Sequence, residues 1–165
     1  MKAVADTSAL LSLEYMGVLD DLLNIADIYT TKSVNEELKE ITGFRDEKSG
    51  IAKKILLHVS DGKIKCIDAK GDMHSKNISL NHCLALCISA KIPILLTEDA
   101  DAAYYLGRMA AQKGVKLRTS TSVLVELIKS GTINTRSARR KLEELMKKRS
   151  WEGGIIEVLA RRYLE

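Results

Sequence analysis

Short apolar runs alternate with amphipathic stretches along this chain. The apolar runs are rich in aliphatic and β-branched residues and only a few residues long, which is typical of buried parallel strands. They predict strands at 3–5, 28–30, 63–67, 93–97 and 115–117. Apolar residues at helical spacing predict helices at 8–13, 19–23, 33–42, 47–59, 79–90, 99–112, 119–129, 135–148 and 152–163. This alternation predicts the α/β class, with an open, mostly parallel sheet flanked by helices.

Serines stand where several of these helices should begin. Ser8 and Ser79 each precede a run of apolar residues at helical spacing, and Ser33 is followed three residues later by Glu36. A serine at the cap position with a glutamate three residues on is the capping-box pattern. We therefore expect these serines to cap their helices.

The chain has the length of one ordinary domain. It contains 165 residues, and we find neither a linker nor an internal repeat. Gly131 interrupts the pattern after the last strand, and two more helices follow it. We expect residues 1–131 to form the sheet domain and residues 132–165 to form a C-terminal helical pair, packed on that domain or on a dimer partner.

The composition excludes several classes of protein. Hydrophobic residues make up 45% and charged residues 29%, which does not fit a disordered or low-complexity chain. Aromatic residues are only 4%, so a surface built on rows of stacking aromatics is disfavoured. No apolar run is long enough to span a bilayer, and we expect a cytoplasmic protein with no membrane partner. The three cysteines show no CxxC spacing, so a disulfide framework or a zinc site is not expected.

The positive charge is concentrated in one segment. Residues 136–149 hold seven basic residues against two acidic ones, a net +5, whereas the whole chain has a net charge of +4. These cations could attract the phosphates of a nucleic acid, or could form the solvated face of a helix whose other face is apolar. The candidate nucleic-acid-binding residues are Arg136, Arg139, Arg140, Lys147 and Lys148.

Acidic residues follow two of the predicted buried strands. Asp6 comes directly after the first strand, Asp99 follows the fourth strand by one residue, and Asp101 lies two residues further on. In an open parallel sheet, ligands bind at the carboxyl ends of the strands, where the strand order reverses. If the first and fourth strands are neighbours, Asp6 and Asp99 converge. The alternatives are a helix cap for Asp6 and a first-turn acid for Asp101.

Glu37 is a third candidate because of its position on the helix at 33–42. At about 100° per residue, and with Val34 at zero, Glu37 falls near 300°, beside the apolar stripe of Leu38 and Ile41. An acid on the inward edge of a helix is costly unless it is paired or binds a cation. Glu37 could therefore be a metal ligand or make a salt bridge at the rim.

Carboxylates that converge without a nearby cation repel one another, and a hard divalent ion removes this repulsion. Mg²⁺ and Mn²⁺ prefer oxygen ligands and are commonly held by a few carboxylates together with a substrate phosphate. Such an ion lowers the pKa of a bound water and stabilises the departing oxygen in displacement at phosphorus. The acids therefore favour metal-dependent phosphoester chemistry.

Three acidic segments follow one another along the chain. They are Val4-Ala5-Asp6-Thr7-Ser8-Ala9-Leu10-Leu11, Ser33-Val34-Asn35-Glu36-Glu37-Leu38 and Leu95-Leu96-Thr97-Glu98-Asp99-Ala100-Asp101. In the order and spacing of these segments the chain resembles the PIN-domain ribonucleases, and within them the VapC-like proteins of prokaryotes. The resemblance runs from residue 2 to about residue 131, so residues 1–131 should be a PIN-like domain. The final helical pair, 132–165, resembles the tail of one branch of the family.

The resemblance implies an acidic pocket that binds Mg²⁺ or Mn²⁺ and cleaves RNA. Asp6, Glu37 and Asp99 match three acids of the family by position, and the hydroxyls of Thr7 or Ser8 and of Thr97 would orient them.

Family members usually carry a further acid near the start of the helix before the fourth strand. That helix begins here with Ser79-Leu80-Asn81-His82-Cys83 and has no carboxylate there. His82 or Asn81 could replace the missing ligand, or Asp101 could compensate for it. His82 could equally be a hydrogen-bonded histidine at a helix start.

Three functions follow from these observations. The first is a metal-dependent endoribonuclease, of which the toxin of a toxin–antitoxin pair is one form. Its expected partners are RNA, a small antitoxin protein and a second copy of the chain. The second is a catalytically degenerate PIN-fold module that binds RNA or protein. A nucleotide-binding or response-regulator-like domain ranks last, since neither GxGxxG nor GxxxxGK[ST] occurs.

Overall fold

A five-stranded parallel sheet forms the centre of the molecule. The computed structural model describes residues 1–71, 76–99 and 104–164, without the side chains of 155, 159 and 163. The strands run in the order β3-β2-β1-β4-β5, and every pair is parallel. They are β1 (Lys2–Ala5), β2 (Asp27–Thr31), β3 (Ile64–Ile67), β4 (Ile94–Leu96) and β5 (Lys116–Arg118). This confirms the predicted fold class.

The strand order reverses between β1 and β4. Val4 lies opposite Leu95 and Ala5 opposite Leu96, so the carboxyl ends of these two strands are side by side. The chain leaves β1 toward one edge of the sheet, through β2 and β3, and returns to the other side of β1 with β4. A parallel sheet opens a crevice at such a switch point, because the connections on either side run in opposite directions.

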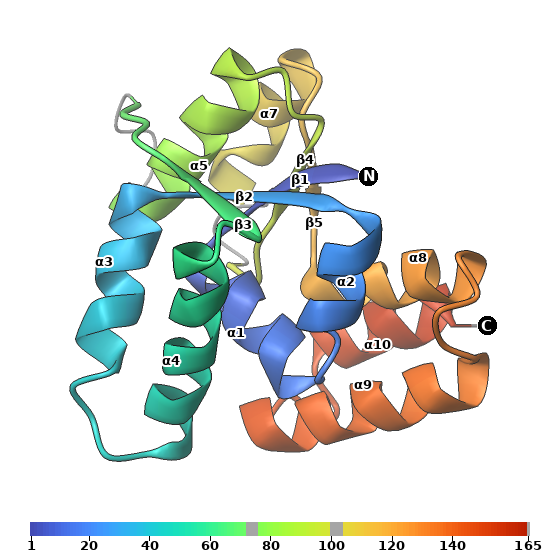
Figure 1. Cartoon of the computed structure of the whole chain (residues 1–165). Helices are drawn as coiled ribbons and strands as arrows, with labels where there is room; N and C mark the ends of the chain where they lie inside the picture. Colours follow the sequence, from blue (N-terminus) through green and yellow to red (C-terminus); the bar gives the residue numbers. More distant parts are fainter. Residues whose placement is uncertain (72–75, 100–103, 165) are drawn as a thin grey trace.

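Helices cover both faces of the sheet. Figure 1 shows α5 and α7 on one side of it and α1, α2 and α4 on the other. The helices before β4 are α1 (Thr7–Tyr15), α2 (Leu19–Ile25), α3 (Lys32–Ile41), α4 (Glu47–Ser60) and α5 (Ile78–Ser89). Those after it are α7 (Gly107–Gln112), the 3₁₀ turn η1 (Ser120–Ser122), α8 (Val123–Lys129), α9 (Thr135–Arg149) and α10 (Ile155–Tyr163). None of the described helices is long and apolar enough to cross a membrane.

Two helix predictions need correction. The helix predicted at 119–129 begins with the 3₁₀ turn η1 and becomes α-helical only from Val123. Of the helix predicted at 99–112, the structure has α7 at Gly107–Gln112, and residues 100–103 lie outside the described part of the chain.

The predicted serine caps are wrong. Asp6 caps α1 and Asn77 caps α5, because each side chain accepts the backbone N–H three residues on. The helix predicted from the capping box starts earlier, at Lys32, and the side chain of its cap residue, Thr31, makes no capping hydrogen bond to the helix backbone. The three serines instead bond to other side chains: Ser8 to Asp6, Ser79 to Glu37, and Ser33 to Thr31 and His82.

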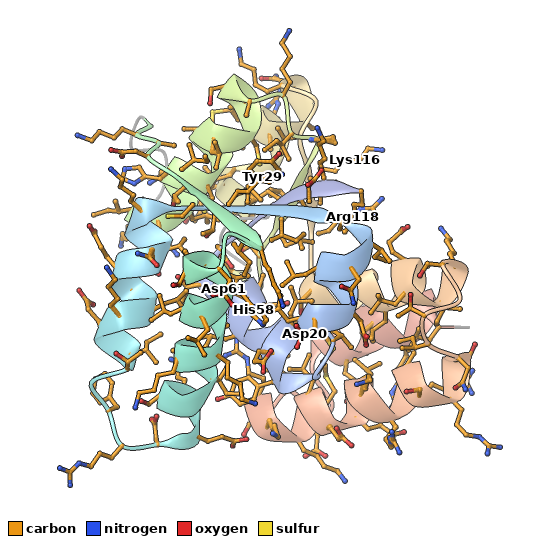
Figure 2. The ribbon with its side chains drawn as sticks, viewed as in Figure 1. Asp20, Tyr29, His58, Asp61, Lys116 and Arg118 are labelled. Carbon is orange, nitrogen blue, oxygen red and sulfur yellow. The ribbon has the colours of Figure 1, made fainter. Side chains whose placement is uncertain are left out.

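Cations lie along both edges of the sheet. Figure 2 shows Lys116 and Arg118 on the β5 side. On the opposite edge strand, Lys65 pairs with Asp27 at 2.8 Å and lies over the ring of Tyr29. Charged side chains on edge strands discourage pairing with the strands of another molecule.

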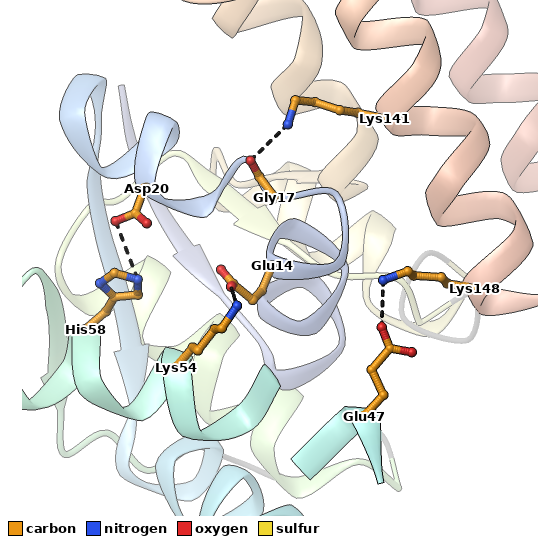
Figure 3. A network of polar contacts seen from close by, with 8 residues as sticks. All are labelled: Glu14, Gly17, Asp20, Glu47, Lys54, His58, Lys141 and Lys148. Atoms are coloured by element: carbon orange, nitrogen blue, oxygen red, sulfur yellow. Dashed lines mark hydrogen bonds and ion pairs between the residues drawn. The ribbon is translucent and has the colours of Figure 1, made fainter. Parts of the chain in front are cut away.

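The helix α9 is anchored to the helices beneath the sheet. Its buried face consists of Ala138, Leu142, Leu145 and Met146, and it contacts α1 and α8. Lys148 Nζ lies 2.6 Å from Glu47 Oε1 at the start of α4, and Lys141 Nζ donates to the backbone oxygen of Gly17 (Figure 3). Lys141 Nζ also donates to the backbone oxygen of Met16. These contacts place the carboxyl end of α9 beside the start of α4.

We expect the buried face of α9 to contribute strongly to stability. Leu145 is fully buried, and Leu145→Ala should lower the free energy of unfolding by roughly 2–5 kcal/mol in urea titrations. Its exposed neighbour Glu144 is the matched control, and Glu144→Ala should change stability by less than about 0.5 kcal/mol. Equal effects of the two substitutions would contradict this packing.

Candidate active site

A cavity of about 560 Å³ opens at the carboxyl edge of the sheet, where β1 and β4 end. Its walls come from the starts of α1, α4 and α5, from α3, from the residues after β4 and from the end of α9. Five acidic residues line it: Asp6, Glu37, Glu40, Glu98 and Asp99. The three acids predicted to be catalytic are among them.

Asp6 is the most deeply buried of these acids, at 3% exposed. Its Oδ1 accepts from the Ser8 hydroxyl and the Ala9 N–H, both at 2.8 Å, and its Oδ2 accepts from the Thr97 hydroxyl at 2.5 Å. Burial raises the pKa of the Asp6 carboxyl, and these hydrogen bonds oppose that rise. In the described part of the chain, no basic side chain forms an ion pair with it.

Thr97 links Asp6 to Asp99. Its hydroxyl donates to Asp6 and accepts the Asp99 N–H at 3.1 Å. Asn77 Nδ2, at the start of α5, donates to Asp99 Oδ2 at 3.3 Å. The negative charge of Asp99 adds a smaller upward contribution to the pKa of Asp6, behind the main effect of burial. The structure thus brings these two acids together, as expected for strands that are neighbours.

Glu37 reaches the same cavity from α3. The hydroxyls of Thr7 and Ser79 donate to its two carboxylate oxygens, so it is held by α1 and α5 at once. No salt bridge of Glu37 occurs within the described residues, in contrast to the rim salt bridge that we considered. Since Thr7 follows Asp6 directly, the hydroxyl that holds Glu37 is adjacent to the buried aspartate.

Of the two auxiliary ligand candidates, His82 and Asp101, only His82 lies in the described part of the chain. The Nδ1 atom of His82 is 3.0 Å from the Ser33 hydroxyl, and His82 is not among the residues that line the cavity. Asp101 lies outside the described residues.

The five predicted nucleic-acid-binding residues also lie outside the cavity lining. The Arg139 guanidinium donates to the Leu164 backbone oxygen, and Lys148 pairs with Glu47. Arg136, Arg140 and Lys147 are exposed on α9. The basic residues that do line the cavity are Lys48 and Arg149.

Glu98 is an acid that the sequence analysis missed. Its Oε1 accepts the Ser120 N–H at 2.7 Å, whereas its Oε2 is buried with no hydrogen-bond partner. Burial raises the pKa of Glu98 from 4.5 to about 7, although the hydrogen bond from Ser120 opposes this. The sequence offered one signal, an additional acid between Thr97 and Asp99, but the burial of this side chain depends on the turn after β5.

The carboxylate oxygens of the cavity suit a hard divalent cation that takes only some of its ligands from the protein. In the part of the chain that the structure describes, no three His, Cys, Asp or Glu side chains stand close enough to hold one ion. Asp6 and Asp99 form a pair, and Mg²⁺ commonly takes only one or two carboxylates, with water and substrate phosphate completing its shell. Two neighbouring carboxylates, one of them buried without a cation, provide the negative charge and the oxygen donors that such an ion requires.

Because burial raises the pKa of Asp6 and of Glu98, we expect the free energy of unfolding to fall as the pH rises. Between pH 4.5 and about 7, the folded state retains the Glu98 proton that the unfolded chain loses, so the free energy of unfolding declines through this window. The upper bound for this decline is roughly 3 kcal/mol. The raised pKa of Asp6 adds a decline in the same direction above pH 3.8.

Urea unfolding in EDTA, from about pH 5 to about pH 8, measures this effect. Glu98→Gln should flatten the curve, because glutamine does not ionise. The exposed cavity residue Glu40 serves as control, and Glu40→Gln should keep the wild-type decline. A Glu98→Gln curve parallel to that of the wild type would contradict the assignment.

Comparison with known proteins agrees with this architecture. A family model described as a PIN domain matches residues 2–154, which includes β1 to β5 and the whole of α9. A comparison with curated proteins finds no match. PIN domains are in general nucleases, and the acidic cavity lies at the switch point of the sheet. The match covers nearly the whole chain, and the protein therefore belongs to the PIN-domain family.

Proposed function

We propose that this protein is a metal-dependent endoribonuclease that cleaves RNA phosphodiester bonds. One observation carries the proposal: the Thr97 hydroxyl donates to the buried carboxylate of Asp6 and accepts the backbone N–H of Asp99, in a cavity that both acids and Glu37 line. A buried carboxylate with no ion pair among the described residues, next to a second carboxylate at the switch point of a parallel sheet, suits a divalent cation and a phosphate substrate.

In this proposal Asp6 and Asp99 hold Mg²⁺ or Mn²⁺. When bound, the ion polarises the phosphate and lowers the pKa of a water molecule. The hydroxyls of Ser8 and Thr97 donate to Asp6, so its carboxylate is already oriented before an ion binds. Glu37, oriented by two hydroxyls, completes the acidic wall and orients the attacking water, a role that Asp99 could share.

The start of α5 supplies neutral groups where family members usually have an acid. Asn77 donates to Asp99, and Ser79 donates to Glu37, so α5 positions the carboxylates of other elements. We propose that the missing acid is tolerated because the remaining three are held rigidly and a phosphate oxygen completes the shell.

One observation favours a second candidate, a catalytically degenerate PIN-fold module that binds RNA or protein. The described residues contain no cluster of three metal-ligating side chains. A module of this kind would keep the cavity and its affinity for RNA or protein without cleaving RNA. The VapC-like resemblance supports the first candidate and extends it to a cytoplasmic toxin, neutralised by a small antitoxin and acting as a homodimer.

Cleavage of a panel of structured and single-stranded RNAs with Mg²⁺, Mn²⁺ or EDTA tests the proposal. We expect metal-dependent cleavage, with a loss on the order of 100-fold or more in Asp6→Asn, because several kcal/mol of charge stabilisation disappear. Asparagine still caps α1, so the fold should survive. Asp61→Asn, at the exposed end of α4, is the control and should cleave normally. Unchanged cleavage by Asp6→Asn would refute the assignment.

Metal binding can be measured apart from catalysis. Saturating Mn²⁺ should raise the melting temperature of the wild type, since a ligand that binds only the folded state stabilises it. At 100 times the dissociation constant the gain is about 2.7 kcal/mol. The double variant Asp6→Asn, Asp99→Asn should lose this shift, and Asp61→Asn should keep it. A full shift in the double variant would place the ion elsewhere.

A further inference from the structure

The cavity that holds the acids is also lined by two aromatic and two basic side chains. Phe44 lies in the loop between α3 and α4, and Lys48 lies in the first turn of α4. Arg149 ends α9, and Trp151 follows it two residues later. Phe44 is 66% exposed, which is costly for a large apolar side chain that has no ligand.

Neither cation, Arg149 or Lys48, forms an ion pair within the part of the chain that the structure describes, although five acids line the same cavity. The Nε atom of Arg149 is buried with no hydrogen-bond partner. The preceding residue, Lys148, has a partner in Glu47 (Figure 3). The two cations of the cavity are therefore available to an anionic ligand.

Arg149 and Trp151 form a stacked pair. The guanidinium carbon of Arg149 lies 4.7 Å from the centre of the Trp151 ring, a cation–π contact that orients both planar groups. A planar guanidinium can bind two oxygens of one phosphate, and an indole ring presents a face on which a base can stack.

The backbone holds this pair in place. Ser150 adopts a left-handed conformation with φ 53°, and the Trp151 N–H donates to the Met146 backbone oxygen at 2.9 Å. This closed turn folds the chain back over the end of α9, whose position is set by Lys148 and Lys141. A ligand therefore meets a preformed surface, and less conformational entropy is lost on binding.

We propose that Trp151, Arg149, Lys48 and Phe44 form a nucleotide subsite beside the acids, which binds one unpaired base and an adjacent phosphate of single-stranded RNA. The base stacks on Trp151 or Phe44, and Arg149 and Lys48 contact the phosphate. Single strands are selected because a base in a duplex is stacked on its neighbours and cannot reach an aromatic ring. The choice of RNA as ligand rests on the proposed function.

Binding of a labelled single-stranded RNA in EDTA tests the subsite without cleavage. In fluorescence anisotropy, Trp151→Ala should weaken binding about tenfold or more, and Trp151→Phe should recover most of it, since a phenyl ring still stacks. Arg149→Ala should weaken binding. It should also reduce the slope of log affinity against log salt concentration by about one, as expected when one phosphate contact is lost. Arg108→Ala, at an exposed arginine of α7 outside the cavity, is the matched control and should bind within about twofold of the wild type.

Trp151 is the single tryptophan of the chain, so its emission reports on the subsite directly. We expect single-stranded RNA to quench this emission saturably, at the concentrations at which anisotropy shows binding. A fully paired duplex of the same length should quench it much less. Equal quenching by both RNAs would overturn the selection of single strands.

The outcomes separate this inference from the proposed function. Binding that depends on Trp151 and Arg149, in a protein that does not cleave RNA with any metal, supports the subsite and refutes the nuclease. Cleavage that needs Asp6, with wild-type RNA affinity in Trp151→Ala and Arg149→Ala, refutes the subsite and leaves the nuclease standing. Absence of RNA binding by the folded wild type would also overturn the subsite.

Discussion

The burial of one carboxylate is the constraint on which the rest of the site depends. Asp6 is almost wholly shielded from water, and a charge in that position is costly unless hydrogen bonds compensate it. The compensation comes from the amide of Ala9 and from the hydroxyls of Ser8 and Thr97. The Asp6 side chain therefore caps α1 and joins the ends of β1 and β4. A residue with both roles couples the stability of the sheet to the geometry of the cavity.

Hydroxyl groups organise the acids around this centre. Thr97 connects Asp6 to Asp99, while Thr7 and Ser79 hold Glu37. Each donor is neutral, so it orients a carboxylate without cancelling its charge. The cavity consequently keeps a negative potential that a salt bridge would remove. This arrangement also accounts for the neutral start of α5, which contributes donors to acids carried by other elements.

The end of α9 and the turn that follows it complete the cavity. Lys148 and Lys141 anchor α9 to the elements under the sheet, and the turn at Ser150 directs Trp151 to the mouth of the acidic pocket. The family match continues through α9 to residue 154, beyond the end of the sheet. The residues that line the acidic cavity therefore come from segments more than a hundred residues apart in sequence. One consequence is that a change in the packing of α9 also alters the wall of the cavity.

The sequence by itself determined the sheet, the order of its elements and the positions of the three principal acids. Apolar runs and helical spacing depend on neighbours in the chain, so the strands, most of the helices and the inward edge that carries Glu37 were predictable. The serine caps were predicted wrongly, because a local motif does not show which other side chains compete for the hydroxyl. Ser8 bonds to Asp6, Ser33 to Thr31 and His82, and Ser79 to Glu37 on another helix. Only the tertiary structure buried Glu98 and placed Arg149 and Trp151 beside Lys48, since burial and the approach of distant segments depend on the packing of the whole chain.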